Sequence, residues 1–345
     1  MTVAMGIAIE FGSGEFRSLR REGGRLLARR ASTDYLVVGP DKARGRVLER
    51  SQEEMARCDE GYIVFGSAAV DLCDLLSLPL QSAIESGSVR ENDPVSRQFL
   101  GALVEGLLPA ASQPKECCVV IAGEPDATRD DIEPDDAFLL QLVRLRGYEP
   151  EAISPGMGLI LAECANSGYT GIAFKMGIGQ IDVSVTYQTR ELLRFTIPRG
   201  GASIDRNLAI SSNSYVRLQD GREVLDIRPI RQWRESLTSI ERIVDARTLD
   251  LRNQLREILF LTLFRLRQEM SPEILKRLPA RIPLVLGGSV SEPAGMEKLL
   301  AQMIKEADLP VEISQVRKVR DARFAPLRGG LIVNEMRNST RGKAA

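Results

Sequence analysis

Residues 7–14, IAIEFGSG, are repeated in altered form as IAFKMGIGQ at residues 172–180, and this pair of segments is the most informative feature of the sequence. In each segment a short apolar run precedes an ionisable residue and a glycine turn, and a second alternating strand follows. The pattern predicts a duplicated β-hairpin, with one copy in each half of the chain. Because glycines let backbone N–H groups converge on a small anion, the pair predicts two lobes that hold one polyphosphate.

A third glycine turn strengthens this interpretation. Gly-x-Gly after a strand is, taken alone, more often an ordinary tight hairpin than a phosphate site. The segment IPLVLGGS at residues 282–289 ends an apolar strand, and an amphipathic helix is expected from about Pro293. Three glycine turns in this order are much less expected by chance than one.

Composition limits the chemistry that the protein can perform. The chain has 345 residues, enough for two lobes of typical domain size, with 46 basic and 47 acidic side chains. This balance favours neither nucleic acid nor an anionic membrane as a partner. The absence of histidine excludes Ser-His-Asp and Cys-His catalysis and histidine-bearing zinc sites. Catalysis would depend on carboxylates, lysine, backbone amides or a bound Mg²⁺.

The sequence predicts a cytoplasmic protein. The N-terminus shows no secretory signal, and the longest apolar stretches, such as residues 258–264, are far too short to span a bilayer. We expect residues 258–264 in the core of the second half rather than at a membrane or filament contact. The five cysteines are an odd number without C-x-x-C spacing, which favours buried thiols in a reducing compartment.

Strands and helices alternate along the chain and predict an α/β fold with a central mixed sheet in each half. The first lobe is expected over residues 1–153, with a small variable subdomain at about 34–80. The second is expected over 154–334, including a long helical region at 229–270. Residues 335–345 are predicted to be a disordered tail.

The order of these elements resembles the actin-like ATPase superfamily, and most closely the bacterial actins of the MreB and MamK type. The resemblance covers nearly the full length and implies the duplicated, ribonuclease H-like two-lobe fold, with ATP and Mg²⁺ as cofactors. The stretches that carry it are residues 7–16 and 171–185 (phosphate loops), 119–136 (catalytic strand and loop), 197–205 (Gly-Gly-x-x-x-Asp), 284–289 (adenosine turn) and 325–330 (glycine helix).

The resemblance also implies site residues. Glu10 stands at the metal position, and Glu133 and Lys175 stand at catalytic positions, with Asp130 and Asp131 as alternatives to Glu133. Otherwise the acidic run at residues 126–136 is a solvated loop and helix start, where the helix dipole favours carboxylates. The residues implied in cofactor binding are Glu10, Gly12, Ser13, Gly14, Gly177, Gly179, Gln180, Gly201, Asp205, Gly287, Gly288 and Ser289.

Two departures from the family lie in the phosphate turns. The family has an aspartate in each turn, which orders Mg²⁺ and its water near the phosphates. Here the first is Glu10 and the second is Lys175, which places a cation where Mg²⁺ would lie. Lys175 either contacts a phosphate directly as a point charge or pairs with a carboxylate such as Glu10 in a decayed site.

Two further departures lie in the second half. Ser154-Pro155 stands where the family has Glu-Pro, so another carboxylate is lost near the hinge. The small subdomain of the second lobe is truncated to about residues 206–227, which predicts weaker nucleoside binding.

Three functions follow from these observations. The first is a divergent actin-like scaffold that self-associates into filaments, with weakened nucleotide binding and reduced or lost hydrolysis. The second is an active Mg-ATP-hydrolysing filament protein that acts in cell shape or organelle positioning. The third is a nonpolymerising adaptor, which the lack of apolar periodicity at residues 334–345 disfavours. The expected partners are further copies of the chain and membrane-associated or cell-envelope proteins, and no nucleic acid. The basic cluster at residues 17–30 is either a solvated hairpin surface or a contact for acidic lipid or a neighbouring subunit.

Overall fold

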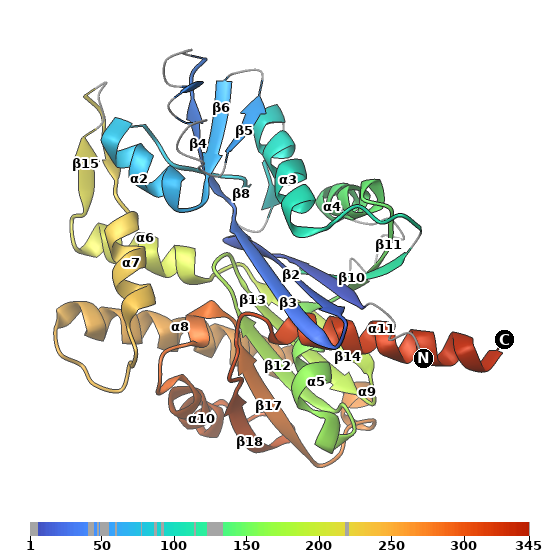
Figure 1. Ribbon diagram of the computed structural model, residues 1–345. Helices are drawn as coiled ribbons and strands as arrows, with labels where there is room; N and C mark the ends of the chain where they lie inside the picture. The colour runs from blue at the N-terminus through green and yellow to red at the C-terminus, as the bar shows by residue number, and fades with distance from the viewer. Residues whose placement is uncertain are drawn as a thin grey trace.

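The computed structural model describes residues 6–40, 45, 46, 48, 55–58, 61–76, 78–85, 88–90, 93–113, 115–122, 134–217 and 221–344. The chain forms two lobes, each built on a five-stranded mixed sheet (Figure 1). This arrangement confirms the predicted two-lobe α/β fold.

The two large sheets share one topology. In each, three successive strands form an antiparallel meander, and two parallel strands are added beside the first of them. The strand orders are β11-β10-β1-β2-β3 and β14-β13-β12-β17-β18. The strands are β1 (Ile7–Phe11), β2 (Glu15–Glu22), β3 (Arg25–Ser32), β10 (Lys115–Ile121), β11 (Tyr148–Ile153), β12 (Gly171–Met176), β13 (Ile181–Tyr187), β14 (Arg190–Ile197), β17 (Arg281–Gly287) and β18 (Glu312–Lys318).

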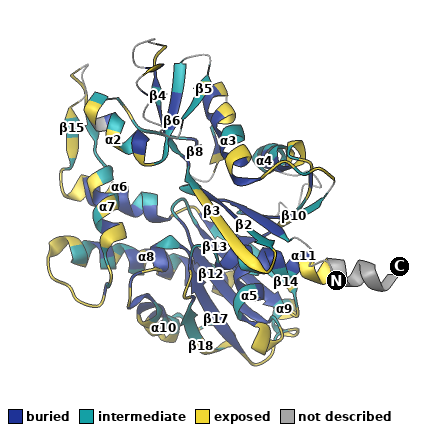
Figure 2. Cartoon of the chain, viewed as in Figure 1, coloured by how far each residue is buried: buried dark blue, intermediate teal, exposed yellow. Residues whose placement is uncertain are grey.

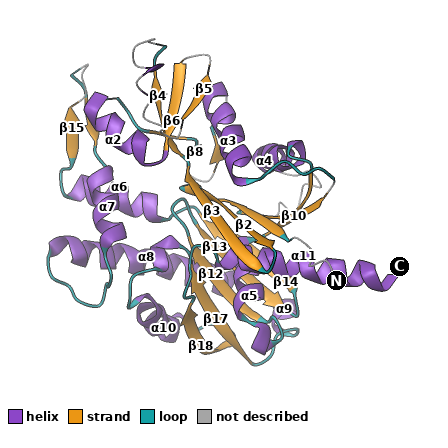
Figure 3. Cartoon of the chain, viewed as in Figure 1, coloured by secondary structure: helices purple, strands orange, loops and turns teal. Residues whose placement is uncertain are grey.

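Helices cover both faces of each large sheet (Figure 3). α5 and α11 pack against each other and against the faces that the two sheets turn toward one another. α3 and α4 cover the outer face of the first sheet, and α6, α8 and α10 cover the second. The helices are α2 (Gly66–Leu76), α3 (Pro94–Leu107), α4 (Pro134–Leu145), α5 (Pro155–Glu163), α6 (Gly201–Ser211), α7 (Arg228–Ser236), α8 (Ala246–Glu269), α9 (Pro272–Leu275), α10 (Met296–Ala307) and α11 (Ala325–Ala344).

Strand alternation determines which side chains reach the centre of the molecule. In β1, Ile7 and Ile9 belong to the outer core of the first lobe, whereas Ala8 packs with α11. In β12, Ile172 and Phe174 belong to the outer core of the second lobe, whereas Ala173 packs with α5. Because successive side chains alternate between faces, positions 10 and 175 lie on the inner faces, which are turned toward the other lobe.

Glycines permit the close crossing of α5 and α11. A Cβ on Gly329 would lie 2.0 Å from the carbonyl oxygen of Gly158, and a Cβ on Gly158 would lie 2.6 Å from that of Pro326. The backbones touch where any side chain would separate them. The glycine helix implied by residues 325–330 therefore packs at the centre of the molecule.

Smaller sheets flank the two lobes. Beside the first lobe they are β5 (Met55–Cys58), β6 (Gly61–Phe65), β4 (Asp34–Val38) and β7 (Gln81–Ser82), with the hairpin β8 (Ile84–Glu85) and β9 (Ser88–Val89). Beside the second lobe, β15 (Tyr215–Arg217) and β16 (Glu223–Leu225) pair with each other. Figure 2 shows the contrast between the buried strands of the second sheet and the exposed edge strand β3.

The structure differs from two predictions. The helical region at 229–270 is two helices, α7 and α8, separated by residues 237–245, because Asp245 caps α8 through the backbone N–H of Thr248. The tail was predicted to be disordered, but α11 continues through it to Ala344. Residues 335–344 extend a helix already nucleated by its packed part, which removes the cost of starting a new one.

We predict that Gly288→Ala destabilises the protein. Gly288 has φ +90°, and a Cβ there would lie 2.3 Å from the carbonyl oxygen of Met176. The expected loss in free energy of unfolding is of the order of 1–3 kcal/mol, measured by urea denaturation. Gly106→Ala is the matched control, because nothing lies within 4 Å of a Cβ at this position of α3. The control should leave stability unchanged or slightly raised, and equal losses in both variants would contradict the explanation.

Candidate functional site

The two glycine turns face one another between the lobes. Residues 12–14 join β1 to β2, and residues 177–179 join β12 to β13. The backbone N–H of Gly12 donates to the carbonyl oxygen of Glu15 over 3.2 Å, and that of Gly177 donates to Gln180 over 2.8 Å. A Cβ on Gly14 would lie 3.1 Å from Cγ1 of Ile178. The structure thus brings the two predicted turns into contact.

The tips of both turns carry backbone donors that the protein does not use. Within the described residues, the N–H groups of Ser13, Gly14, Ile178 and Gly179 donate to no protein acceptor. All four residues are partly accessible to solvent. Unpaired N–H groups at converging turns form a concave surface of positive partial charge.

Glu10 and Lys175 form an ion pair across the two lobes. The Nζ atom of Lys175 lies 3.0 Å from Oε1 of Glu10, and the side chains are only 9% and 1% exposed. The contact joins β1 of the first lobe to β12 of the second. Of the two interpretations that the sequence left open for Lys175, this geometry favours pairing with Glu10.

Each hairpin adds a second charge to this pair. Arg17 is the cross-strand partner of Glu10 on β2, with 3.3 Å between guanidinium and carboxylate. Asp182 is the cross-strand partner of Lys175 on β13, at 3.7 Å. Two carboxylates and two cations, all buried, therefore form a neutral group, which we call the interlobe quartet.

The surroundings keep the central pair ionised. Burial alone would raise the pKa of Glu10, but the nearby Lys175 and Arg17 hold it below its usual value. Burial alone would lower the pKa of Lys175, but Glu10 and Asp182 raise it. For Asp182, burial outweighs the attraction of Lys175 and raises the pKa. The closest contact in the quartet is thus one between full charges.

The quartet does not fit a divalent cation. Glu10 is the carboxylate implied as the metal ligand, but the ammonium of Lys175 occupies the space beside its Oε1 atom. No group of three or more acidic, cysteine or histidine side chains in the described residues could hold a metal. Mg²⁺ prefers an octahedral set of oxygen ligands, and here one carboxylate already has two cationic partners.

Arginines line the entrance to the space beside the turns. Arg231 of α7 lies 2.8 Å from Asp34 at the start of β4, which makes a second ion pair between the lobes. Arg323 pairs with Glu292 at 2.7 Å, and its carbonyl oxygen accepts a hydrogen bond from Arg17. These ion pairs are partly exposed, so each stabilises the protein by no more than about 1 kcal/mol.

Asp205 is directed into the second lobe. Its carboxylate is fully buried and accepts two hydrogen bonds from Arg234, at 2.5 and 2.9 Å. A Cβ on Gly201 would lie 3.0 Å from Nη2 of Arg234, so a larger residue would crowd this contact. The geometry favours packing of α6 on α7 as the role of both residues, whereas the sequence predicted cofactor contacts.

The third glycine turn has two different surroundings. Gly287 faces Leu159 of α5, since a Cβ would lie 2.8 Å from a methyl group of that leucine. Gly288 lies against the backbone of Met176. Ser289 lines the same cavity as Gly12, Gly14 and Lys175. Of the three predicted residues, Ser289 is the one that faces the space between the lobes.

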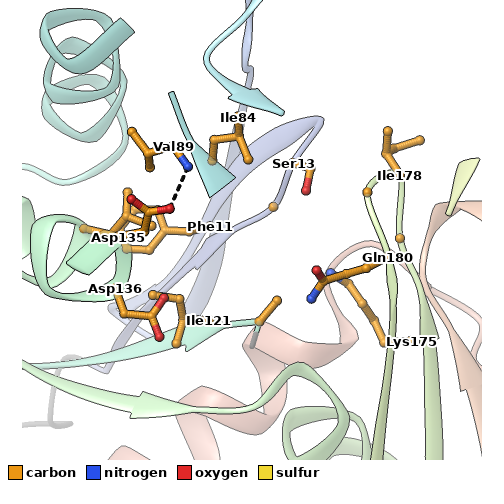
Figure 4. A pocket seen from close by; sticks show the side chains of 15 residues that line it. Phe11, Ser13, Ile84, Val89, Ile121, Asp135, Asp136, Lys175, Ile178 and Gln180 are labelled. Carbon is orange, nitrogen blue, oxygen red and sulfur yellow. Dashed lines mark hydrogen bonds between the residues drawn. The ribbon is translucent and has the colours of Figure 1, made fainter. Parts of the chain in front are cut away.

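The acidic wall of the site lies on α4. Glu133, with Asp130 and Asp131, lies outside the described residues, so its predicted catalytic role stays a prediction. Figure 4 shows Asp136 of α4 across the cavity from Gln180 and Lys175. Asp135 accepts a hydrogen bond from the backbone of Val89 and is therefore tied to β9 (Figure 4).

Half of the quartet was not predicted from the sequence, although the sequence contains a signal for it. Arg17 follows Glu10 by seven residues, and Asp182 follows Lys175 by the same interval. In a hairpin with a short turn, this spacing makes the two residues cross-strand partners on one face. Glu191 was not predicted either; it accepts a hydrogen bond from Ser154 and supplies a carboxylate beside the start of α5.

A family model described as Volactin matches residues 5–333 of the chain. No curated protein matches the sequence. The solved structures that are similar include a MamK double helical filament, at 14% identity and a TM-score of 0.68, covering 96% of this chain and 98% of that one.

Two further solved structures show the same likeness. MreB 5 of Spiroplasma citri bound to AMPPNP is 10% identical with a TM-score of 0.70, covering 99% of each chain. The ethanolamine utilization protein EutJ from Carboxydothermus hydrogenoformans is 11% identical with a TM-score of 0.53, covering 96% of this chain and 90% of that one. These likenesses confirm the actin-like fold of the MreB and MamK type.

We predict that Glu10→Gln lowers stability in a pH-dependent way. At neutral pH the substitution leaves the buried Lys175 without its closest partner, at a cost of about 3 kcal/mol in free energy of unfolding. Because the folded pKa of Glu10 lies below its usual value, its contribution is complete above about pH 5 and is lost as the pH falls.

The measurement is urea unfolding of the wild type and of Glu10→Gln between about pH 6 and about pH 3. The difference between them should shrink toward the acidic end, and a constant difference would contradict the ion pair. Asp182 is present in both proteins, but Glu10 is one of the charges that raise its pKa, so its opposite dependence cancels only in part. Glu306→Gln at the exposed end of α10 is the control, with an expected effect below about 0.5 kcal/mol.

Proposed function

The chain belongs to the Volactin family, and from this premise we propose that it is an actin-like scaffold that self-associates into filaments. In this proposal nucleotide hydrolysis between the lobes is reduced or lost. The observation that carries the proposal is the cross-lobe ion pair between Glu10 and Lys175. It joins the lobes at the point where the bacterial-actin resemblance implies a metal and phosphates.

Exposed apolar side chains support self-association. Phe260 and Phe264 on α8 are 59% and 52% exposed, and their rings stack with centroids 6.2 Å apart. The sequence predicts the whole apolar run at residues 258–264 in the core, and Ile258, Leu259 and Leu263 are buried there, whereas the two phenylalanine rings face outward. Two large exposed rings on one face of a helix favour burial against a partner. One of the similar structures is, by its title, a filament of MamK.

A hydrolytic filament protein is the second candidate. Asp136 and Gln180 line one cavity with Lys175, so a carboxylate and an amide flank the position between the turns. Two of the similar proteins are, by their titles, bound to AMPPNP. In this candidate Lys175 would stabilise charge that develops on a phosphate, and Glu133 would orient water. Phosphate release that persists in Lys175→Ala and Glu133→Ala would exclude these roles.

The proposed location is the cytoplasm, and the proposed partners are further copies of the chain. All five cysteines are unbridged, which suits a reducing compartment. Among the described helices, none combines the length and the apolar character needed to cross a bilayer. Any membrane or envelope partner would have to bind at the surface. The exposed basic strand β3 is the candidate surface for such a contact.

We predict that the purified protein assembles at high concentration and releases phosphate from ATP only slowly. Light scattering should rise with protein concentration, and electron microscopy should show elongated assemblies. Phosphate release should stay near the background without enzyme and should not change in Lys175→Ala. Monodisperse protein at every concentration, with and without ATP, would contradict self-association. Rapid phosphate release that Lys175→Ala abolishes would favour the hydrolytic candidate.

A further inference from the structure

The cavities beside the two glycine turns suit an anion. Ser13, Gly14, Ile178 and Gly179 each present a backbone N–H that meets no acceptor in the described residues. The adjoining cavity has a volume of about 230 Å³ and is lined by Ser13, Gly14 and Ile178, so it has room for a short chain of phosphates. Its wall carries five cationic side chains and three acidic ones. Backbone donors and a cationic excess point to the same class of ligand.

The cations of this wall retain donors for a ligand. Arg17 pairs with Glu15 at 3.0 Å and with Glu10 at 3.3 Å, and it donates to the carbonyl oxygen of Arg323. Arg231 and Arg323 pair with carboxylates at 2.8 and 2.7 Å. A guanidinium has five N–H donors, and these contacts use only some of them. Arginine pairs readily with phosphate oxygens, often through two parallel hydrogen bonds. The ion pairs therefore fix the positions of the arginine side chains and leave some of their N–H donors available to a ligand.

The charge balance beside the turns leaves no role for a divalent cation. The interlobe quartet has two positive and two negative members, so its net charge is zero. An aspartate at position 175 would change this charge by two units and would leave three carboxylates against one guanidinium. That group would call for a divalent cation, whereas the existing one does not. Lys175 provides a positive charge that is part of the protein chain, and it lines both cavities beside the turns.

We infer that the cleft between the lobes binds a polyphosphate chain directly, without a divalent cation. The N–H groups of the two turns, Lys175 and the arginines of the wall contact the phosphate oxygens. This inference rests on the proposed function in one respect, namely that the altered cleft is still the ligand site of the protein. It goes beyond that proposal because it assigns the binding to protein groups that contact the phosphates directly and excludes a divalent cation.

The phosphate chain supplies most of the affinity in this site. Beside the third glycine turn, the space is lined by Leu237, Ile240 and Arg234, and Arg234 is held by Asp205. The cavity there has a volume of only about 20 Å³, against about 230 Å³ for the cationic cavity. A nucleoside would therefore add little beside the third glycine turn. A larger cavity of about 500 Å³ is lined by Ser13, Ile178 and Gly179 and has room for one, so ATP should bind at least as tightly as inorganic tripolyphosphate.

The test is isothermal titration of the full-length protein with tripolyphosphate, ATP and adenosine, each in excess EDTA and in excess Mg²⁺. Tripolyphosphate and ATP should both bind in EDTA, whereas adenosine alone should not bind. Added Mg²⁺ should leave the affinity unchanged or weaken it, because the ion competes with the protein for the phosphates. Binding that requires Mg²⁺, or no binding of either polyphosphate, would overturn the inference.

Two variants with the same change of charge test whether metal-free binding depends on Lys175. Lys175→Asp should weaken tripolyphosphate binding in EDTA by at least about tenfold and should make the remaining binding depend on Mg²⁺. Lys305→Asp makes the same change of charge at an exposed position of α10 and should alter the affinity by less than about twofold. Equal losses in both variants would show a nonspecific response to net charge and would overturn the assignment to Lys175. The wild-type comparison needs no variant, so the inference stays testable if Lys175→Asp does not fold.

Assembly is measured separately from binding. Titrations at protein concentrations below the onset of light scattering report the cleft alone. Metal-free binding by a protein that never assembles would support this inference and contradict the filament proposal. Assembly without any polyphosphate binding would do the reverse.

Discussion

A buried carboxylate in one lobe and a buried ammonium in the other resist separation, because each would be left as an unpaired charge in a medium of low polarity. Glu10 and Lys175 form such a pair, with 3.0 Å between Oε1 and Nζ and with side chains that are 1% and 9% exposed. Opening the two lobes at the turns would break this contact and expose both groups to water. The ion pair therefore links the state of the cleft to the relative position of the lobes. A ligand that enters between the turns acts on the same charges.

The pair follows from duplication of one hairpin with inverted charges. The first copy carries Glu10 opposite Arg17, and the second carries Lys175 opposite Asp182. Strand alternation turns all four side chains toward the other lobe. Each hairpin therefore places a charge opposite a charge of the other sign. A protein with carboxylates in both turns would need a cation between them. Here the chain itself supplies both the negative and the positive charges, so a metal is not needed to neutralise them.

Much of the fold could be predicted because it depends on local patterns. The strands, the glycine turns and the small residues Ala8 and Ala173 are visible in a single sequence, and so is the duplication. The break between α7 and α8 was missed because apolar spacing continues across it, while the cap at Asp245 is a single polar residue. The contact of Arg234 with Asp205 joins helices through tertiary packing, which no local pattern reports. Arg17 and Asp182 could have been predicted from the sequence, because the equal spacing in the two hairpins identifies them as the cross-strand partners of Glu10 and Lys175.

The most direct measurement is an X-ray structure of crystals soaked in Mn²⁺, with anomalous scattering used to locate the metal. Manganese prefers the same oxygen ligands as magnesium and gives a signal that water cannot imitate. We expect no anomalous peak between the two glycine turns and Nζ of Lys175 within hydrogen-bonding distance of the Glu10 carboxylate. A metal coordinated by Glu10, with Lys175 turned away from it, would contradict the claim that the ammonium group of Lys175 replaces the divalent cation.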